Sequence, residues 1–220
     1  MAMEPTVFIV DDEAPVRESL ELLLHSAGLR VQSYPSALAF LAAYRPERPG
    51  CLLLDVRMPG MSGLELQEEL QRRGHSIPVV FLSGHGDVPM AVHAMKRGAQ
   101  DFLQKPCDDS LLLERVRQAL ARDLNERRRQ RRIATALARL QLLSPREFQV
   151  LELIVAGCLN KVIAARLSLS LATVESHRRS IMTKLRASSL SDLVRLLECY
   201  RQHATQGASG EPERSYADPT

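Results

Sequence analysis

The sequence lacks any apolar run close to the roughly 20 residues that a membrane-spanning helix requires. Residues 1–10 also lack the basic segment followed by a hydrophobic segment that is typical of a secretory signal. We therefore expect a cytoplasmic protein without a membrane partner.

Cysteines arranged to form disulfides or to bind a metal are lacking as well. The four cysteines, Cys51, Cys107, Cys158 and Cys199, include no CxxC pair and have no histidines at metal-ligand spacing. We expect buried free thiols rather than a disulfide framework or a zinc site.

The length of 220 residues, of which 45% are hydrophobic, suffices for two modest domains with a core each. The net charge of +3 is unevenly distributed. Residues 1–107 have 10 Lys/Arg and 13 Asp/Glu, a net charge of −3, whereas residues 108–220 have 19 and 13, a net charge of +6. The basic half is the candidate for binding an anionic partner.

Up to residue 124 the sequence alternates five times between a short apolar run and a segment with apolar residues every three to four positions. This alternation predicts an α/β domain over residues 5–124, built on a doubly wound five-stranded parallel sheet. The apolar runs are residues 7–10, 31–34, 52–54, 79–82 and 102–103.

The second half shows helical patterns and no strands. Residues 125–132 contain no apolar side chain, which suits either a solvated helix extension or an exposed linker. Apolar periodicity resumes at Ile133, Leu137 and Leu140, so we expect a helical linker over residues 125–140. Residues 141–203 indicate an all-α domain, and the Gly-, Ser-, Pro- and Glu-rich tail, residues 204–220, is predicted to be disordered.

Charged residues gather at the ends of the predicted strands. Asp11 and Asp12 follow the first apolar run, Asp55 follows the third, and Lys105 follows the fifth. The carboxyl ends of parallel strands line one crevice, so these residues are expected to meet. Three carboxylates at one point repel one another unless a cation holds them, and hard oxygen ligands suit Mg²⁺. The pattern indicates a phosphoryl-transfer centre.

The first domain resembles the receiver domain of bacterial response regulators, which has a flavodoxin-like fold. The matching elements occur in order and at suitable spacing, which argues strongly against coincidence. They are the pair Asp11-Asp12, the loop Asp55-Val56-Arg57-Met58-Pro59-Gly60-Met61-Ser62-Gly63, Ser83-Gly84, and Asp101-Phe102-Leu103-Gln104-Lys105-Pro106.

The resemblance implies a role for each residue of this centre. Asp55 would accept a phosphoryl group from a sensor histidine kinase. Asp12, Asp55 and the Arg57 carbonyl would hold Mg²⁺, and Asp11 would assist through water. Because the attacking carboxylate and the donor are both anionic, the metal and an ammonium group must neutralise their charge. The remaining implied roles are a pairing of Lys105 with the phosphoryl group, a hydrogen bond from Ser83 to it, and an inward turn of Phe102 after Ser83 has moved.

A phosphatase of the haloacid dehalogenase type is an enzymatic alternative, since it also has an aspartate nucleophile after a strand. Such enzymes place a second acid two residues after the nucleophile. Arg57 occupies that position here, and the other acids lie on an earlier strand, which favours the receiver.

The helical domain has its own sequence signals. Ser144, Pro145 and Glu147 predict a capping box with proline at the first helical position, and further helices are expected to begin near Asn160 and Thr173. On the last of these, three apolar residues share one face, with His177 packed at its margin, and the opposite side chains suit a major groove. The apolar residues are Val174, Ile181 and Leu185, and those opposite are Glu175, Ser176, Arg179 and Thr183.

This domain resembles the helix-turn-helix domain of the LuxR and NarL family, and the whole chain most resembles the FixJ and StyR subgroup. The match implies that residues 173–184 form the recognition helix, that Lys161 contacts phosphate, and that Arg178 reaches the DNA backbone. Glu175 either accepts a hydrogen bond from cytosine or orients a neighbouring arginine. The implied DNA contacts are Lys161, Thr173, Glu175, Ser176, Arg178, Arg179, Thr183 and Lys184.

Together the resemblances imply a phosphorylation-activated transcriptional regulator of a two-component system. It would not be an enzyme, apart from Mg²⁺-dependent self-phosphorylation and autodephosphorylation at Asp55. The implied partners are a sensor histidine kinase, double-stranded promoter DNA, RNA polymerase and, after phosphorylation, a second copy bound through residues 88–97, the Phe102 strand and residues 111–124. An alternative is a DNA-binding protein whose receiver serves only for dimerisation, but the intact Asp55 and Lys105 argue against it.

Overall fold

The structure is a computed structural model that describes residues 4–84 and 88–208, with side chains up to residue 201. The chain divides into two compact units, Met1–Arg128 and Arg129–Thr220. Within the described ranges, no helix is both long enough and apolar enough to cross a membrane.

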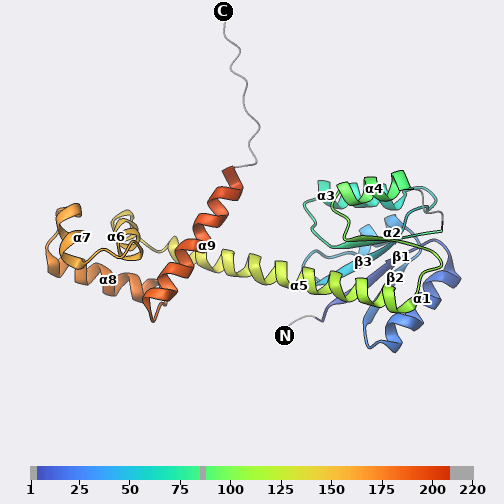
Figure 1. Ribbon diagram of the computed structural model, residues 1–220, viewed down its shortest axis with the longest axis horizontal. Helices are drawn as coiled ribbons and strands as arrows, with labels where there is room; N and C mark the ends of the chain where they lie inside the picture. The colour runs from blue at the N-terminus through green and yellow to red at the C-terminus, as the bar shows by residue number, and fades with distance from the viewer. Residues whose placement is uncertain (1–3, 85–87, 209–220) are drawn as a thin grey trace, which may run out of the picture. The chain divides into compact units, whose positions relative to one another are not determined.

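The first unit is built on a five-stranded parallel sheet, which confirms the predicted fold (Figure 1). The strand order is β2-β1-β3-β4-β5. Because β1 and β3 are in register from Thr6 opposite Gly50 to Val10 opposite Leu54, the residues that follow these two strands emerge side by side. The strands are β1 (Thr6–Val10), β2 (Arg30–Tyr34), β3 (Gly50–Asp55), β4 (Val79–Ser83) and β5 (Asp101–Gln104).

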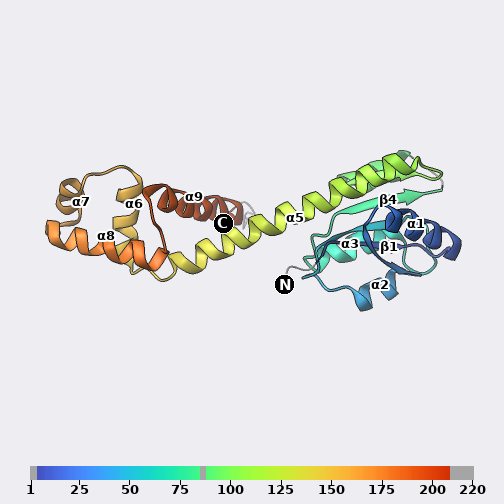
Figure 2. The same ribbon diagram turned by 90° about the horizontal axis from the view of Figure 1, so that it is seen from below.

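Helices cover both faces of the sheet because successive strand residues point to opposite sides (Figures 1 and 2). Phe8 and Leu52 pack against α2 (Ala37–Ala43), α3 (Gly63–Arg72) and α4 (Val88–Lys96). Val7 and Leu53 pack on the other face, against α1 (Ala14–Ser26) and the first half of α5 (Asp109–Leu140). Both faces are therefore buried, which explains why the strands are continuous apolar runs.

Helix α5 is one uninterrupted helix of 32 residues, so the charged segment 125–132 is a helix extension rather than an irregular linker. Near the middle of α5, buried Asp123 accepts hydrogen bonds from the Gly50 amide at 2.9 Å and from Arg127 Nε at 2.7 Å. Arg127 also donates to the Arg48 carbonyl at 2.9 Å. The beginning of the predicted linker is therefore attached to the first unit.

The second unit is all-α, as predicted, and its core also includes Leu140 from the end of α5. Helix α8 begins at Leu171, two residues before the predicted start, because the Ser170 side chain caps it by accepting from the Thr173 amide. Residues 204–208, predicted as part of the disordered tail, are helical, and residues 209–220 lie outside the described residues. The helices are α6 (Pro145–Val155), α7 (Asn160–Leu167), α8 (Leu171–Leu185) and α9 (Leu190–Ala208).

The four cysteines are free thiols, as predicted. Cys51 is buried in the sheet, and burial raises the pKa of its thiol. The prediction of burial is wrong for the other three, which are only partly buried because two lie in loops, after β5 and after α6, and the third lies on α9 where it lines a hollow. These three are Cys107, Cys158 and Cys199.

Candidate functional site

Three of the four predicted charged residues meet at the carboxyl end of the sheet. Asp11 follows β1, Asp55 ends β3 and Lys105 follows β5. The Lys105 ammonium lies 2.6 Å from Asp11 Oδ2 and 2.7 Å from Asp55 Oδ1, and so bridges two carboxylates whose residues are 1% and 8% exposed. One positive charge offsets the repulsion between the two acids.

The second oxygen of each carboxylate is held by the local backbone. Asp11 Oδ1 accepts from the Glu13 amide at 2.8 Å, and Asp55 Oδ2 accepts from the Arg57 amide at 2.6 Å. Each carboxylate is thus fixed at both oxygens, one by an amide and one by the ammonium. This preorganised arrangement is what electrostatic catalysis requires.

The position and the charge of Lys105 follow from its neighbours. Its backbone amide donates to the Ser83 carbonyl at 2.7 Å, which fixes the lysine beside the end of β4. Burial lowers the pKa of Lys105, but its hydrogen bonds with Asp11 and Asp55 outweigh burial and hold this pKa above the ordinary value of lysine. The side chain is therefore an ammonium at neutral pH.

Asp12, the fourth predicted residue, lies apart from this triad. It is exposed and lines a shallow hollow of about 560 Å³ together with Arg57, Met58 and Met90. In the part of the chain that the structure describes, no group of three or more His, Cys, Asp and Glu side chains is placed to hold a metal ion. The metal-binding roles of Asp11, Asp12, Asp55 and the Arg57 carbonyl stay predictions.

The two predicted switch residues lie on neighbouring strands beside the triad. Ser83, which ends β4, is only 2% exposed. Phe102 on β5 is partly buried, and its ring centroid lies 6.1 Å from that of Phe81. Phe102 packs against the core cluster that includes Ala94 of α4. The predicted movement of both residues stays untested.

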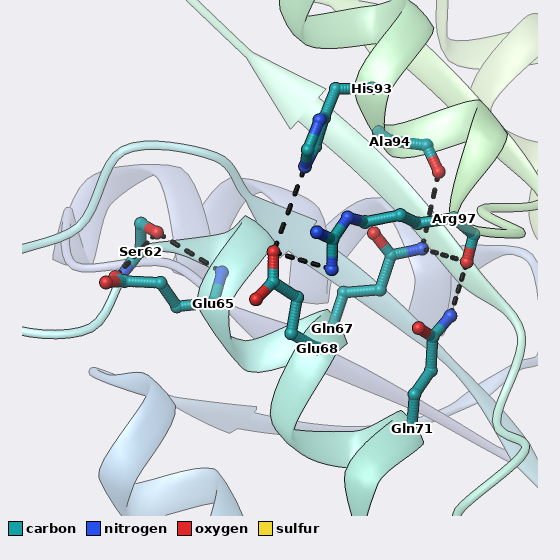
Figure 3. Close-up of polar contacts among 8 residues, drawn as sticks. All are labelled: Ser62, Glu65, Gln67, Glu68, Gln71, His93, Ala94 and Arg97. Carbon is teal, nitrogen blue, oxygen red and sulfur yellow. Dashed lines mark hydrogen bonds and ion pairs between the residues drawn. The ribbon is translucent and has the colours of Figure 1, made fainter. Parts of the chain in front are cut away.

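The sequence did not reveal a polar network that joins α3 to the end of α4 (Figure 3). Gln67 Nε2 donates to the carbonyls of Ala94 and Arg97, at 3.4 and 3.2 Å, and Gln71 also donates to the Arg97 carbonyl. Glu68 forms an ion pair of 2.7 Å with Arg97. These contacts supply partners for carbonyls at the end of α4 that the helix itself leaves free.

Helix α3 also contacts the strand that ends at Asp55. It begins with a capping box formed by Ser62 and Glu65. A Cβ atom at Gly63 would lie 2.1 Å from the Asp55 carbonyl oxygen, so only glycine permits this approach. Because Gln67 and Gln71 are on the same helix, α3 connects the Asp55 loop to the end of α4.

Helix α8 has the two faces that the sequence predicted. Val174, Ile181 and Leu185 are all 0% exposed, and His177 is partly buried at their margin. The opposite side chains, Glu175, Ser176, Arg179 and Thr183, are exposed. Lys161 at the start of α7 is also exposed, whereas Thr173, Arg178 and Lys184 are partly buried.

Lys184 points toward Glu147 at the start of α6. Glu147 is 5% exposed, and its carboxylate accepts hydrogen bonds from Lys184 Nζ at 2.7 and 2.9 Å and from Ser180 Oγ at 2.6 Å. The Ser144 amide donates to it at 2.7 Å, which confirms the predicted capping box. One buried carboxylate thus ties α6 to two successive turns of α8, and the DNA contact of Lys184 stays a prediction.

The charge of Glu147 is stabilised by these partners. Burial raises the pKa of its carboxyl, but the hydrogen bonds from Lys184, Ser180 and Ser144 outweigh burial and lower the pKa to about 2. Because this is below the ordinary value of about 4.3, ionised Glu147 stabilises the fold above that pH. The stabilisation is lost as the pH falls from about 4.3 toward 2.

We expect Glu147→Gln to destabilise the α6–α8 contact by about 1–3 kcal/mol at neutral pH, because Lys184 loses its buried partner. The measurement is amide hydrogen exchange of α6 and α8 in the full chain. Glu175→Gln, on the exposed face of α8, is the matched control. The difference between Glu147→Gln and the wild type should shrink as the pH is lowered toward 3, and a constant difference would contradict the assigned pKa.

Comparisons with known proteins place both units in families. The model of the response regulator receiver domain matches residues 7–117, and the model of the bacterial regulatory proteins of the luxR family matches residues 141–197. FixJ of Azorhizobium caulinodans, a transcriptional regulatory protein, is 50% identical over 190 residues, which are 86% of this chain and 90% of FixJ. The response regulator TmoT of Ectopseudomonas mendocina is 47% identical over 195 residues, 89% of each chain.

Two solved structures of similar length agree with these matches. The response regulator StyR superimposes with a TM-score of 0.82 at 47% sequence identity, covering 90% of this chain and 100% of StyR. Full-length FixJ of B. japonicum gives a TM-score of 0.56 at 39% identity, covering 91% of this chain and 99% of FixJ. The chain belongs to the family of two-component response regulators that combine a receiver domain with a LuxR-type DNA-binding domain and regulate transcription.

Proposed function

We propose that Asp55 accepts a phosphoryl group from a sensor histidine kinase. The observation that supports this most directly is the Lys105 ammonium 2.7 Å from Asp55 Oδ1, where it would neutralise part of the charge of donor and acceptor. The Asp55 side chain is 11% exposed and that of Asp11 is 2% exposed, so Asp55 is the more accessible nucleophile. Ser83 would hydrogen-bond to the transferred group, and Phe102 would then turn inward.

Receiver domains bind Mg²⁺ for phosphorylation, and the residues present here fit that ion. Asp12 and Asp55 offer carboxylate oxygens and Arg57 offers a carbonyl, which are the hard ligands that Mg²⁺ prefers. Among the residues that the structure describes, the Asp12 carboxylate has no hydrogen-bond or ion-pair partner and is free to bind a cation. Asp11 would assist through water, and the bound ion would supply further positive charge next to Lys105.

Incubation with acetyl phosphate should add one phosphoryl group to the chain, and chelation of Mg²⁺ should prevent it because the donor and acceptor charges would then repel each other. Asp55→Asn should abolish the adduct, whereas Asp109→Asn on α5 should not change it. Intact-mass spectrometry detects the product, and peptide mapping locates it. Equal labelling of Asp55→Asn, or labelling in the presence of EDTA, would refute the assignment.

We also propose that α8 is the recognition helix and enters the major groove of promoter DNA. Its apolar face is packed in the core, which leaves the opposite face to contact bases and backbone. Within the described residues, the Arg179 guanidinium has no hydrogen-bond or ion-pair partner, so it can reach a base edge without breaking a contact. The proposed contacts are Lys161, Thr173, Glu175, Ser176, Arg178, Arg179, Thr183 and Lys184.

Arg179→Ala should weaken binding to operator DNA by about 1–3 kcal/mol and relax its sequence preference, because a base contact is lost. Lys161→Ala should weaken binding to all sequences and make it less dependent on salt. Fluorescence anisotropy at several salt concentrations separates the two effects. Arg30→Ala, an exposed arginine on β2 outside the proposed DNA and dimer surfaces, is the control. If Arg179→Ala and Lys161→Ala both bind operator DNA with wild-type affinity, the placement of the recognition helix is refuted.

Phosphorylation would act on DNA binding through pairing of receivers. We propose that two copies meet through α4, β5 and the first half of α5, since α4 exposes an apolar stripe there. Val88 is 75% exposed, Val92 46% and Met95 45%, and their spacing places them on one face of α4. A dimer brings two recognition helices to adjacent half-sites, where bound regulator would meet RNA polymerase. The proposed site of these events is the cytoplasm.

Acetyl phosphate should convert the full chain from monomer to dimer in sedimentation velocity. Val92→Glu should prevent this conversion without preventing phosphorylation, because it places a charge in the centre of the apolar stripe. Leu38→Glu is the matched control, since Leu38 is an exposed leucine on α2, outside the proposed surface. A phosphorylated wild type that stays monomeric would refute the proposed mechanism, and a dimer independent of acetyl phosphate would favour a receiver that serves only for dimerisation.

A further inference from the structure

A hollow rich in arginine lies in the second unit, away from the exposed face of α8. Its volume is about 460 Å³, within the range of roughly 300–1,000 Å³ that is typical of small-molecule sites. One wall comes from the end of α5, one from α9, and the third from the residue that caps α8. The arginines that line it are Arg131, Arg132, Arg139, Arg186 and Arg195.

The periodicity of the two helices explains why these side chains converge. Arg131 and Arg132 are followed along α5 by Thr135, Ala136 and Arg139, at steps of three to four residues. Asp192, Arg195, Leu196 and Cys199 follow the same spacing along α9. Residues three and four apart share one face of a helix, so each helix presents one face to the hollow.

The positive charge of the arginines that line the hollow is offset by only one of its lining side chains. Its single carboxylate, Asp192, accepts hydrogen bonds from the hydroxyl and the amide of Ser188 at 2.8 and 2.9 Å and lies 2.5 Å from Arg195, and these contacts lower the pKa of Asp192. Five guanidinium groups and one carboxylate give a net charge of +4 at neutral pH.

Three of these guanidinium groups are free to bind an anion. Among the described residues, Arg131, Arg132 and Arg186 have no partner for their side-chain nitrogens. Crowded like charges of this kind favour an anion that accepts several hydrogen bonds at once.

The floor of the hollow is apolar. Ala136 is 1% exposed, and Leu196 and Cys199 are partly buried beside it. A simple inorganic anion would leave this surface uncovered, whereas a purine or pyrimidine ring would cover it and could stack against a guanidinium plane. We propose that this hollow binds a nucleoside polyphosphate, with the phosphates on the arginines and the base on the Ala136–Leu196 floor.

The test uses the full chain, ATP as the probe, and EDTA to keep the receiver free of Mg²⁺. Isothermal titration calorimetry should detect ATP binding that is tighter than binding of inorganic triphosphate. Arg132→Gln and Arg131→Gln should each weaken it by about tenfold or more, because each removes charged hydrogen bonds to phosphate. Arg128→Gln is the matched control, since Arg128 is an exposed arginine on the same helix outside the hollow.

Alkylation of Cys199 gives a second measurement that reports the location of the ligand. ATP should slow the reaction of Cys199 with N-ethylmaleimide and leave the rate at Cys107 unchanged, as followed by peptide mass spectrometry. Any of four results would overturn the proposal: no ATP binding, triphosphate binding as tightly as ATP, an equal loss in Arg128→Gln, or an unprotected Cys199. Loss of operator binding in Arg131→Gln and Arg132→Gln without ATP binding would identify the hollow as a surface for DNA phosphates instead.

Discussion

The bridge from Lys105 to Asp11 and Asp55 is the interaction on which the first unit depends. Two carboxylates at the end of a buried sheet are tolerated only with a cation between them. The three side chains come from the ends of β1, β3 and β5, so they meet only if these strands stay in register. The parallel pairing of β1 with β3, β3 with β4 and β4 with β5 sets that register.

The second unit also contains a buried carboxylate paired with a lysine, but this pair has a different role. Glu147 is buried and paired with Lys184, yet this pair lies between two helices and orients α8 against α6. In the first unit the pair lies at an accessible strand end, where another anion can reach the ammonium. A carboxylate and an ammonium group therefore have a proposed reactive role in the first unit and a positioning role in the second, depending on what surrounds them.

Most of the architecture was predictable because it rests on local patterns. Apolar runs and their spacing predicted the sheet, and the rule for carboxyl ends of parallel strands brought Asp11, Asp55 and Lys105 together. Contacts between residues that are far apart in the sequence were not predicted. The spacing on α8 could not show that Lys184 faces Glu147, 37 residues earlier, or that glutamines of α3 reach the end of α4. Asp12 lies apart because the chain bends just after β1, where Asp11 is buried and Asp12 is exposed.

The continuity of α5 affects where recombination can join a receiver domain to a different output domain during evolution. The two family models leave residues 118–140 outside both matches, yet Ala119 and Leu120 belong to the core of the first unit and Leu140 to that of the second. Residues 128–132 are all exposed, and Arg127 before them is hydrogen-bonded to the first unit. A junction within residues 128–132 would therefore join a receiver to a new output domain without cutting into either core.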